Sequence, residues 1–240
     1  MKKNAIKTIL ICIGVAIVSV FATLCVVLFP HKDNPPTAKE IFSNNLYSVV
    51  ELKSSTESVG ESFGTAEFVL ADGTLVTNAH VVTYTRLGIV QTFEKYEIRF
   101  ATEDDYRAVA LIKYDTNLDV AVLKLTDTNC TFKPVAIGVS ATLNSGDKVY
   151  AIGNAVNYGL SMSEGIVGIP LIQIEYSNAT REVIQCDLTI AEGNSGGALL
   201  NEKGQLIGIT TFRTKDGVGN VVYGLAYCLP IDLVMEYVKR

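Results

Sequence analysis

Histidine and cysteine are scarce in this chain of 240 residues, and tryptophan is absent. Three cysteines lie outside the first 30 residues, and their wide spacing and odd number exclude a disulfide framework. With only two histidines, no zinc-binding pattern is present either. We therefore expect no metal and no cofactor, and we interpret these cysteines as small, mostly buried hydrophobic residues. They are Cys130, Cys186 and Cys228.

An excess of basic charge is also lacking. Four of the 20 basic residues and none of the 25 acidic residues lie within residues 1–32, which leaves 16 basic against 25 acidic residues and a net charge of −9 for the remainder. Phosphate groups and anionic lipid headgroups are repelled by such a surface. We expect neither nucleic acid nor an anionic membrane surface as its partner.

The longest apolar run extends from Thr8 to Phe29 and contains no charge, and three lysines precede it. As a helix it would be about 33 Å long, close to the thickness of a bilayer core. It is longer than the apolar core of a cleaved signal peptide, and no clear cleavage pattern follows it. We therefore predict an uncleaved transmembrane signal anchor over 8–29, with residues 1–7 in the cytoplasm and the rest outside the cell membrane. A cleaved signal peptide and a buried core helix are the alternatives.

Residues 30–40 are polar and proline-rich, which predicts a short linker. After it come many apolar runs of 5–8 residues rich in Val, Ile, Leu and Thr, separated by turn signals such as "ADG", "NSGD" and "NEKG". This pattern indicates an all-β sandwich or barrel. The last residues, "PIDLVMEYVKR", instead place apolar side chains at helical spacing. They predict a short C-terminal helix.

Ser195 stands between glycines in "EGNSGGALL" and needs a base if it is a nucleophile. His80, at the end of the strand-like run "LVTNAHVV", is the candidate, although a lone histidine after a strand is usually structural. An imidazole base in turn needs a carboxylate that fixes its tautomer. Asp119 opens the apolar run "DVAVLKL", where an unpaired charge would be costly, so we prefer it to Asp115 in the polar turn before it.

Three segments in this order, "TNAHVV" (77–82), "DVAVLK" (119–124) and "GNSGGALL" (193–200), resemble the trypsin-like serine peptidases and, more narrowly, the bacterial HtrA (Deg) proteases. The segments "AIGN" (151–154) and "SEGIVG" (163–168) are similar to the middle strands of that family. The resemblance covers roughly residues 41–240. It implies two six-stranded antiparallel barrels that meet near residues 128–140, with the site in the cleft between them.

The resemblance also implies roles for single residues. His80, Asp119 and Ser195 would be the catalytic triad, and the backbone N–H groups of Gly193 and Ser195 would form the oxyanion hole. Thr211 would lie beside the carboxylate of Asp119.

The substrate pocket implied by the resemblance contains Thr189, Ile190, Thr211, Phe212 and Arg213. Thr189, six residues before the serine, would lie at the base of the pocket that receives the residue before the cleaved bond. It offers no carboxylate to Lys or Arg, so we expect cleavage after small or medium aliphatic residues. An acidic residue is the weaker alternative, because Arg213 would stand near the pocket mouth.

These features predict a membrane-anchored, extracytoplasmic serine endopeptidase that acts on proteins or peptides. HtrA proteases usually carry PDZ domains after the protease, and we expect none here because the sequence ends at Arg240. The resemblance implies a homo-oligomer, a trimer in that family, although the segment 83–97 after the histidine is short. Two other functions stay open. One is a non-catalytic binding or scaffold protein on a protease fold, and the other is an esterase-type acyl hydrolase, although the Ser…Asp…His order of the α/β-hydrolases is absent.

Overall fold

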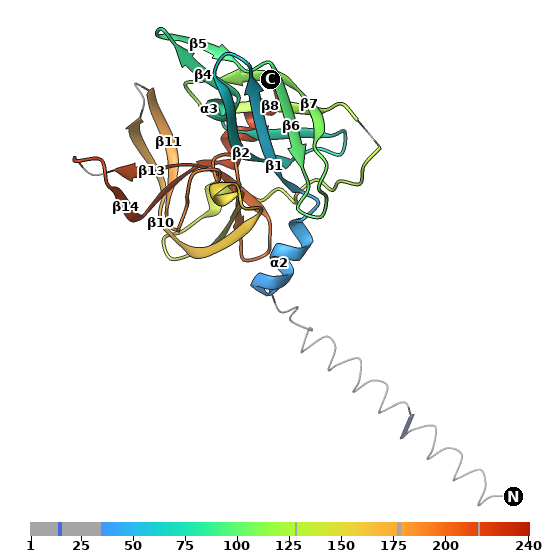
Figure 1. Cartoon of the computed structure of the whole chain (residues 1–240). Helices are drawn as coiled ribbons and strands as arrows, with labels where there is room; N and C mark the ends of the chain where they lie inside the picture. Colours follow the sequence, from blue (N-terminus) through green and yellow to red (C-terminus); the bar gives the residue numbers. More distant parts are fainter. Residues whose placement is uncertain (1–13, 16–34, 128, 177–178, 216) are drawn as a thin grey trace, which may run out of the picture. The chain divides into compact units, whose positions relative to one another are not determined.

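The computed structural model describes residues 14–15, 35–127, 129–176, 179–215 and 217–240. The chain separates into two units, Met1–Pro35 and Pro36–Arg240, and the second holds all of the strands that the structure describes (Figure 1). None of the described helices is both long enough and apolar enough to cross a bilayer. The predicted anchor, 8–29, lies outside the described residues except at Gly14 and Val15.

Helix α2 (Ala38–Asn45) begins inside the segment that we expected to be a linker. Thr37 caps it: its hydroxyl accepts from the backbone N–H of Glu40 over 3.3 Å, and the Glu40 carboxylate accepts from the Thr37 backbone N–H over 2.8 Å. This reciprocal pair is the capping box that the sequence "TAKE" encodes. The backbone N–H of Thr37 and its hydroxyl both donate to the Glu40 carboxylate and lower the pKa of Glu40. Ile41 anchors the helix in the hydrophobic core.

Six antiparallel strands form the first closed barrel, in the order β1-β2-β3-β8-β7-β6. Phe68, Leu75 and Leu123 fill its interior and are fully buried. The strands are β1 (Val49–Thr56), β2 (Gly60–Phe68), β3 (Thr74–Thr77), β6 (Lys95–Arg99), β7 (Arg107–Asp115) and β8 (Val120–Leu125).

The second closed barrel has the strand order β10-β11-β14-β13-β12-β9. Its strands lie opposite those of the first barrel in Figure 1. The predicted boundary near 128–140 falls after β8 and before β9. The strands are β9 (Lys148–Gly153), β10 (Ser161–Tyr176), β11 (Ala179–Asp187), β12 (Ala198–Asn201), β13 (Leu206–Lys215) and β14 (Val221–Pro230).

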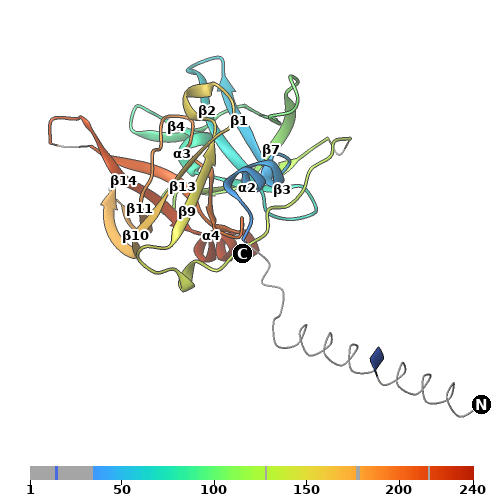
Figure 2. The same cartoon turned by 90° about the horizontal axis from the view of Figure 1, so that it is seen from below.

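Short elements complete the fold. The expected C-terminal helix is present as α4 (Ile231–Lys239), which packs on β13 and β14 and also touches β8 (Figure 2). The one-turn helix α3 (Ala79–Val82) follows β3, and the hairpin of β4 (Thr83–Arg86) and β5 (Ile89–Thr92) projects from the first barrel (Figure 1). Two 3₁₀ turns, η1 (Ser140–Thr142) and η2 (Ala155–Asn157), lie on either side of β9. The mostly-β fold with a short closing helix is therefore confirmed.

Both barrels contribute to one continuous hydrophobic cluster, so they form a single packed body. Burial of each Val, Leu or Ile side chain stabilises such a core by about 1.5–3 kcal/mol. The cluster fixes the two barrels against each other, and residues from both can therefore meet in one site. Its members include Val49, Val76 and Val120 of the first barrel and Ile152, Ala198 and Leu200 of the second.

The three cysteines in the described residues form no disulfide. Cys186 on β11 and Cys228 on β14 are fully buried, as expected of small hydrophobic residues, and Cys130 is half-buried. Hydrogen bonding with Cys186 and burial both raise the pKa of the Cys228 thiol, so it stays protonated and unreactive in the folded protein.

Candidate active site

His80 is held at the rim of the first barrel by the helix α3. The next two residues, Val81 and Val82, are buried in the barrel core. The imidazole of His80 lies at the surface of that core, and 48% of its side chain is exposed. Asn78, just before the helix, donates from its side-chain amide to the backbone oxygen of Asp119 over 3.0 Å. This hydrogen bond connects the histidine segment to the aspartate segment independently of the contact between the His80 and Asp119 side chains.

Asp119 follows a tight turn between β7 and β8. The carboxylate of Asp115 accepts from the backbone N–H groups of Asn117 (2.8 Å) and Leu118 (3.0 Å), so Asp115 shapes the turn and does not reach His80. Asp119 itself has φ = 60°, a left-handed conformation that costs energy for a residue with a side chain. Such strained residues cluster at functional sites, where the surrounding structure enforces them.

Asp119 is only 3% exposed, and its carboxylate has three hydrogen-bond partners. It lies 2.9 Å from His80 Nδ1, accepts from the His80 backbone N–H over 3.1 Å, and accepts from Thr211 Oγ1 over 2.7 Å. Burial by itself would raise the pKa of Asp119, but the charge of His80 and these hydrogen bonds hold the pKa below its usual value. The carboxylate is therefore ionised, and Thr211 lies where the resemblance implied.

Ser195 faces the same space from the second barrel. Its hydroxyl donates to the backbone oxygen of Thr211 over 3.2 Å, and no hydrogen bond joins it to His80 within the described part of the chain. Its backbone oxygen accepts from the N–H of Thr65 in β2 over 2.9 Å, which ties the serine to the first barrel. Ser195 and His80 line the same cavity.

The glycines around Ser195 are required by close packing. Gly193 has φ = 89°, and a Cβ there would collide with the backbone oxygen of Asn154. Gly196 has φ = 78°, and a Cβ there would collide with Thr77 and with the backbone of Thr65. Only glycine combines this conformation with this approach. Among the described residues, no group accepts a hydrogen bond from the N–H of Gly193 or Ser195.

A cavity of about 570 Å³ lies over these side chains. His80, Asp119 and Ser195 line it together with four of the five predicted pocket residues. Thr189 is not among the described residues that line it. Thr189 is exposed, and its backbone oxygen accepts from the Ser163 hydroxyl over 3.0 Å. The four pocket residues that do line the cavity are Ile190, Thr211, Phe212 and Arg213.

The cavity walls combine apolar and cationic groups. The ring of Phe212 stacks on Tyr176 with centroids 3.8 Å apart, which builds an aromatic wall. Arg213 Nη1 donates to the backbone oxygen of Ile190 over 3.2 Å, so its guanidinium lies against the Ile190 backbone in the cavity wall. Glu192 lines the cavity with an exposed side chain.

Sequence reasoning missed two parts of the cavity. Thr85 and Val90 of the β4–β5 hairpin line it near His80. Arg181 on β11 reaches across to the first barrel, where Nε donates to Asn117 O over 2.8 Å and Nη2 donates to Thr116 O over 2.9 Å. The β-branched residues on either side of "RLG" in "TYTRLGIVQT" are a signal for the hairpin. The sequence gives no signal for the long-range contacts of Arg181.

Comparisons with known proteins agree with this geometry. Residues 64–209 match the family model described as a trypsin-like peptidase domain. The chain is 29% identical to the serine endoprotease DegS of Haemophilus influenzae over 198 residues, which are 82% of this chain and 55% of that protein. It is 36% identical over 168 residues to a probable periplasmic serine endoprotease DegP-like of Buchnera aphidicola, with 68% of this chain and 32% of that protein covered.

A solved structure of the HtrA-type protease AlgW with a tripeptide has the same fold, with a TM-score of 0.71 and 27% identity. The alignment covers 85% of this chain and 63% of that one. The chain thus spans about half, or less, of the length of the curated relatives described above.

Proposed function

Because this chain belongs to the trypsin-like peptidase domain family, we propose that it is a serine endopeptidase in which His80, Asp119 and Ser195 form the catalytic triad. One observation carries the proposal: the buried carboxylate of Asp119 contacts both His80 Nδ1 and Thr211 in the cavity that Ser195 faces. The HtrA-like relatives and structural neighbours support the same function.

The chemistry follows from the partners of each group. Asp119 accepts a hydrogen bond from the Nδ1–H of His80, which keeps that proton on Nδ1 and leaves Nε2 free to accept a proton from Ser195. Ser195 Oγ attacks the peptide carbonyl, and the resulting oxyanion is stabilised by the N–H groups of Gly193 and Ser195. His80 then gives the proton to the leaving amine, and an acyl-enzyme remains. Water then gives a proton to the same imidazole and attacks that ester, and the imidazole returns the proton to Ser195 Oγ as the acid leaves.

The cavity walls support a preference at the residue before the cleaved bond. Ile190 and Phe212 are each 9% exposed and offer apolar surface, which suits small or medium aliphatic side chains. The guanidinium of Arg213 favours an acidic side chain as the alternative. A peptide-library profile decides between the two, and a profile dominated by Lys or Arg would contradict both.

The two alternative functions, an esterase and a non-catalytic scaffold, can be tested with the same protein. Residues 193–197 match the pattern G-x-S-x-G of α/β-hydrolases, but Ser195 lies in a turn before the strand β12 and not at a strand-to-helix elbow. A fluorophosphonate probe that labels the wild-type protein but not Ser195→Ala separates a hydrolase from a scaffold. Cleavage of a denatured protein, compared with turnover of a simple ester, separates a peptidase from an esterase. No labelling and no cleavage would leave the scaffold function.

The proposal includes the location of the protein. The uncharged run 8–29 after three lysines supports a single-pass anchor with the peptidase outside the cytoplasm, as does the word periplasmic in the names of DegP-like relatives. Protease added to intact cells or spheroplasts should then digest residues 36–240. Complete protection would contradict this topology. Light scattering of the detergent-solubilised protein tests whether it forms the trimer that the family resemblance implies.

A further inference from the structure

Thr65 lies in the middle of β2 in the first barrel and is fully buried, yet its hydroxyl and its backbone N–H bind residues of the second barrel. Its hydroxyl donates to the backbone oxygen of Gly193 over 2.8 Å and accepts from the backbone N–H of Asn154 over 2.9 Å. Its backbone N–H donates to Ser195 O over 2.9 Å, and its backbone oxygen accepts from Thr77 Oγ1 over 2.7 Å. Thr65 thus binds the backbone oxygens of both Gly193 and Ser195, the two residues whose N–H groups would form the oxyanion hole.

The direction of these hydrogen bonds is fixed by chemistry. The N–H of Asn154 can only donate, so the Thr65 hydroxyl must use a lone pair there. The single hydroxyl proton then points to the oxygen of Gly193, which can only accept. Both partners are buried, so each would lose a hydrogen bond without gaining water if the hydroxyl were removed.

Peptide groups on either side of the oxyanion donors are all held by hydrogen bonds. The oxygen of Glu192 accepts from Val156 N–H over 2.7 Å, and the N–H of Asn194 donates to Ala191 O over 3.1 Å. The oxygen of Gly193 is held by Thr65. Among residues 193–195, the N–H of Asn194 has an acceptor, whereas those of Gly193 and Ser195 have none within the described part of the chain. These are the two groups that the proposed mechanism needs.

We propose that Thr65 is a positioning residue for the oxyanion hole, and the proposal rests on the function argued above. Its hydroxyl holds the Gly193–Asn194 peptide through the Gly193 oxygen, while the Val156 N–H holds the preceding Glu192–Gly193 peptide, which carries the Gly193 N–H. With both peptides fixed, Gly193 keeps the conformation that leaves its N–H free for the substrate. Glycine tolerates many backbone conformations, so a segment with Gly193 and Gly196 does not keep one orientation by itself. The constraint comes from the opposite barrel, which makes a formed oxyanion hole depend on correct docking of the two barrels.

Steady-state kinetics on the full chain test the proposal with a matched set of variants. Thr65→Val keeps the shape and removes the hydroxyl, whereas Thr65→Ser keeps the hydroxyl. Loss of one oxyanion donor typically costs about 10²–10³ in rate, so an indirect loss through Thr65→Val should lower kcat by about 10–100-fold with KM within about twofold. Thr65→Ser should retain activity within about threefold of the wild type.

Ser140→Ala is the control for a purely structural effect. It removes a part-buried hydrogen bond to Asp232, 2.7 Å long, and neither residue is among the described residues that line the cavity. At matched loss of thermal stability, this variant should keep its kcat. A kcat of Thr65→Val equal to that of the wild type, or a Thr65→Ser variant as impaired as Thr65→Val, would overturn the proposal.

Hydrogen exchange measured by mass spectrometry gives a second readout that does not require catalysis. Peptides that cover residues 190–198 should exchange at least about tenfold faster in Thr65→Val than in Ser140→Ala of equal stability, because the Asn194 N–H loses its fixed geometry. Equal exchange would overturn the role of Thr65 even if the chain cleaves no substrate. A wild-type chain as inactive as Ser195→Ala would instead contradict the proposed function, and exchange would still decide the role of Thr65.

Discussion

His80 Nδ1 lies 2.9 Å from one carboxylate oxygen of Asp119 and 3.0 Å from the other, and the backbone N–H of the same histidine donates to that carboxylate over 3.1 Å. The ring and the main chain of His80 are therefore both oriented by one buried acid. A third partner, Thr211, fixes the acid itself over 2.7 Å.

Asp119→Asn should lower kcat by about 10⁴-fold while the fold is retained. The amide has the shape of the carboxylate, but it stabilises the wrong imidazole tautomer and carries no charge to balance an imidazolium. Steady-state kinetics with a peptide substrate measures the loss of kcat. Asp115→Asn is the matched control, because Asp115 only shapes the preceding turn. Comparable losses in the two variants would contradict the assignment of the acid.

Ser195→Ala should abolish cleavage and change the melting temperature by no more than about 2 °C. The reason is that, among the described residues, the hydroxyl makes a single hydrogen bond, 3.2 Å long, to the Thr211 oxygen, so its removal costs little stability. His80→Ala should lose activity to a similar extent, because nucleophile and base act as a unit. Differential scanning fluorimetry and cleavage of a denatured protein check both statements. Full activity in either variant would refute the triad.

Much of the fold and of the site can be predicted from the sequence where a residue and its near neighbours along the chain determine the local structure. Asp119 was preferred to Asp115 since a carboxylate at the start of an apolar strand needs a buried partner, and the structure places Asp119 beside His80. The closing helix was predicted from its apolar spacing. The start of α2 at Ala38 was missed, although the capping box "TAKE" stands in the sequence.

Long-range contacts explain what could not be predicted. Thr65 and Gly193 are 128 residues apart, and Arg181 and Asn117 are 64 apart, so no local pattern joins them. The family resemblance implies Thr189 at the base of the substrate pocket. In the structure Thr189 is exposed, and the next residue, Ile190, lines the cavity.

Glu67 should make the protein less stable as the pH rises. Its carboxyl is fully buried between Val49 and Val76, neither oxygen has a hydrogen-bond partner among the described residues, and burial raises its pKa well above the usual value of 4.5. The folded state keeps this proton at a pH where the unfolded chain has lost it. The contribution of Glu67 to the free energy of unfolding is therefore fully present below pH 4.5. As the pH rises above that value it is lost, by at most about 1.4 kcal/mol per pH unit.

Chemical denaturation of wild type and Glu67→Gln between pH 4 and 9 measures this effect. The free energy of unfolding of the variant should fall less steeply with pH, so that the variant becomes the more stable protein at the alkaline end. Glu61→Gln, an exposed position on the same strand, is the control and should follow the wild type. Parallel curves for Glu67→Gln and wild type would show that Glu67 ionises without cost.

Arg181→Met should weaken both the fold and the reaction. The side chain of Arg181 donates to the oxygens of Thr116 and Asn117, in the turn that leads to the strained Asp119, and its guanidinium lies 5.7 Å from the ring centroid of Tyr176. Loss of two charge-assisted hydrogen bonds from a side chain that is mostly buried should destabilise the protein by about 2–4 kcal/mol. Because Asp119 then holds its position less firmly, kcat should fall by about tenfold, less than in Asp119→Asn.

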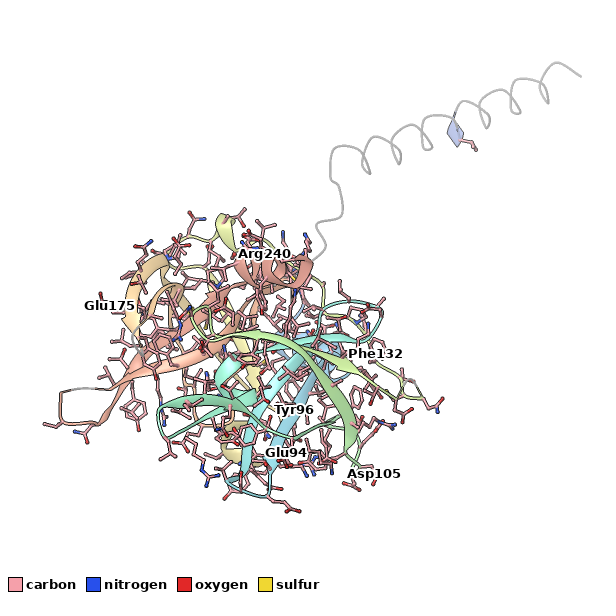
Figure 3. The ribbon with its side chains drawn as sticks, turned by 90° about the horizontal axis from the view of Figure 1, so that it is seen from above. Glu94, Tyr96, Asp105, Phe132, Glu175 and Arg240 are labelled. Carbon is pink, nitrogen blue, oxygen red and sulfur yellow. The ribbon has the colours of Figure 1, made fainter. Side chains whose placement is uncertain are left out.

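Arg240→Met is the control for loss of an arginine as such, since Arg240 lies at the end of α4 and pairs only with the exposed Glu236 among the described residues (Figure 3). An exposed pair of this kind contributes at most about 1 kcal/mol, so this variant should match the wild type in kcat. Arg181→Lys separates charge from geometry: a single ammonium cannot reproduce the planar fork that binds two carbonyls, and kcat should stay below that of the wild type. Wild-type activity in Arg181→Met, with its stability lowered, would show that the turn keeps Asp119 in place without the bridge between the barrels.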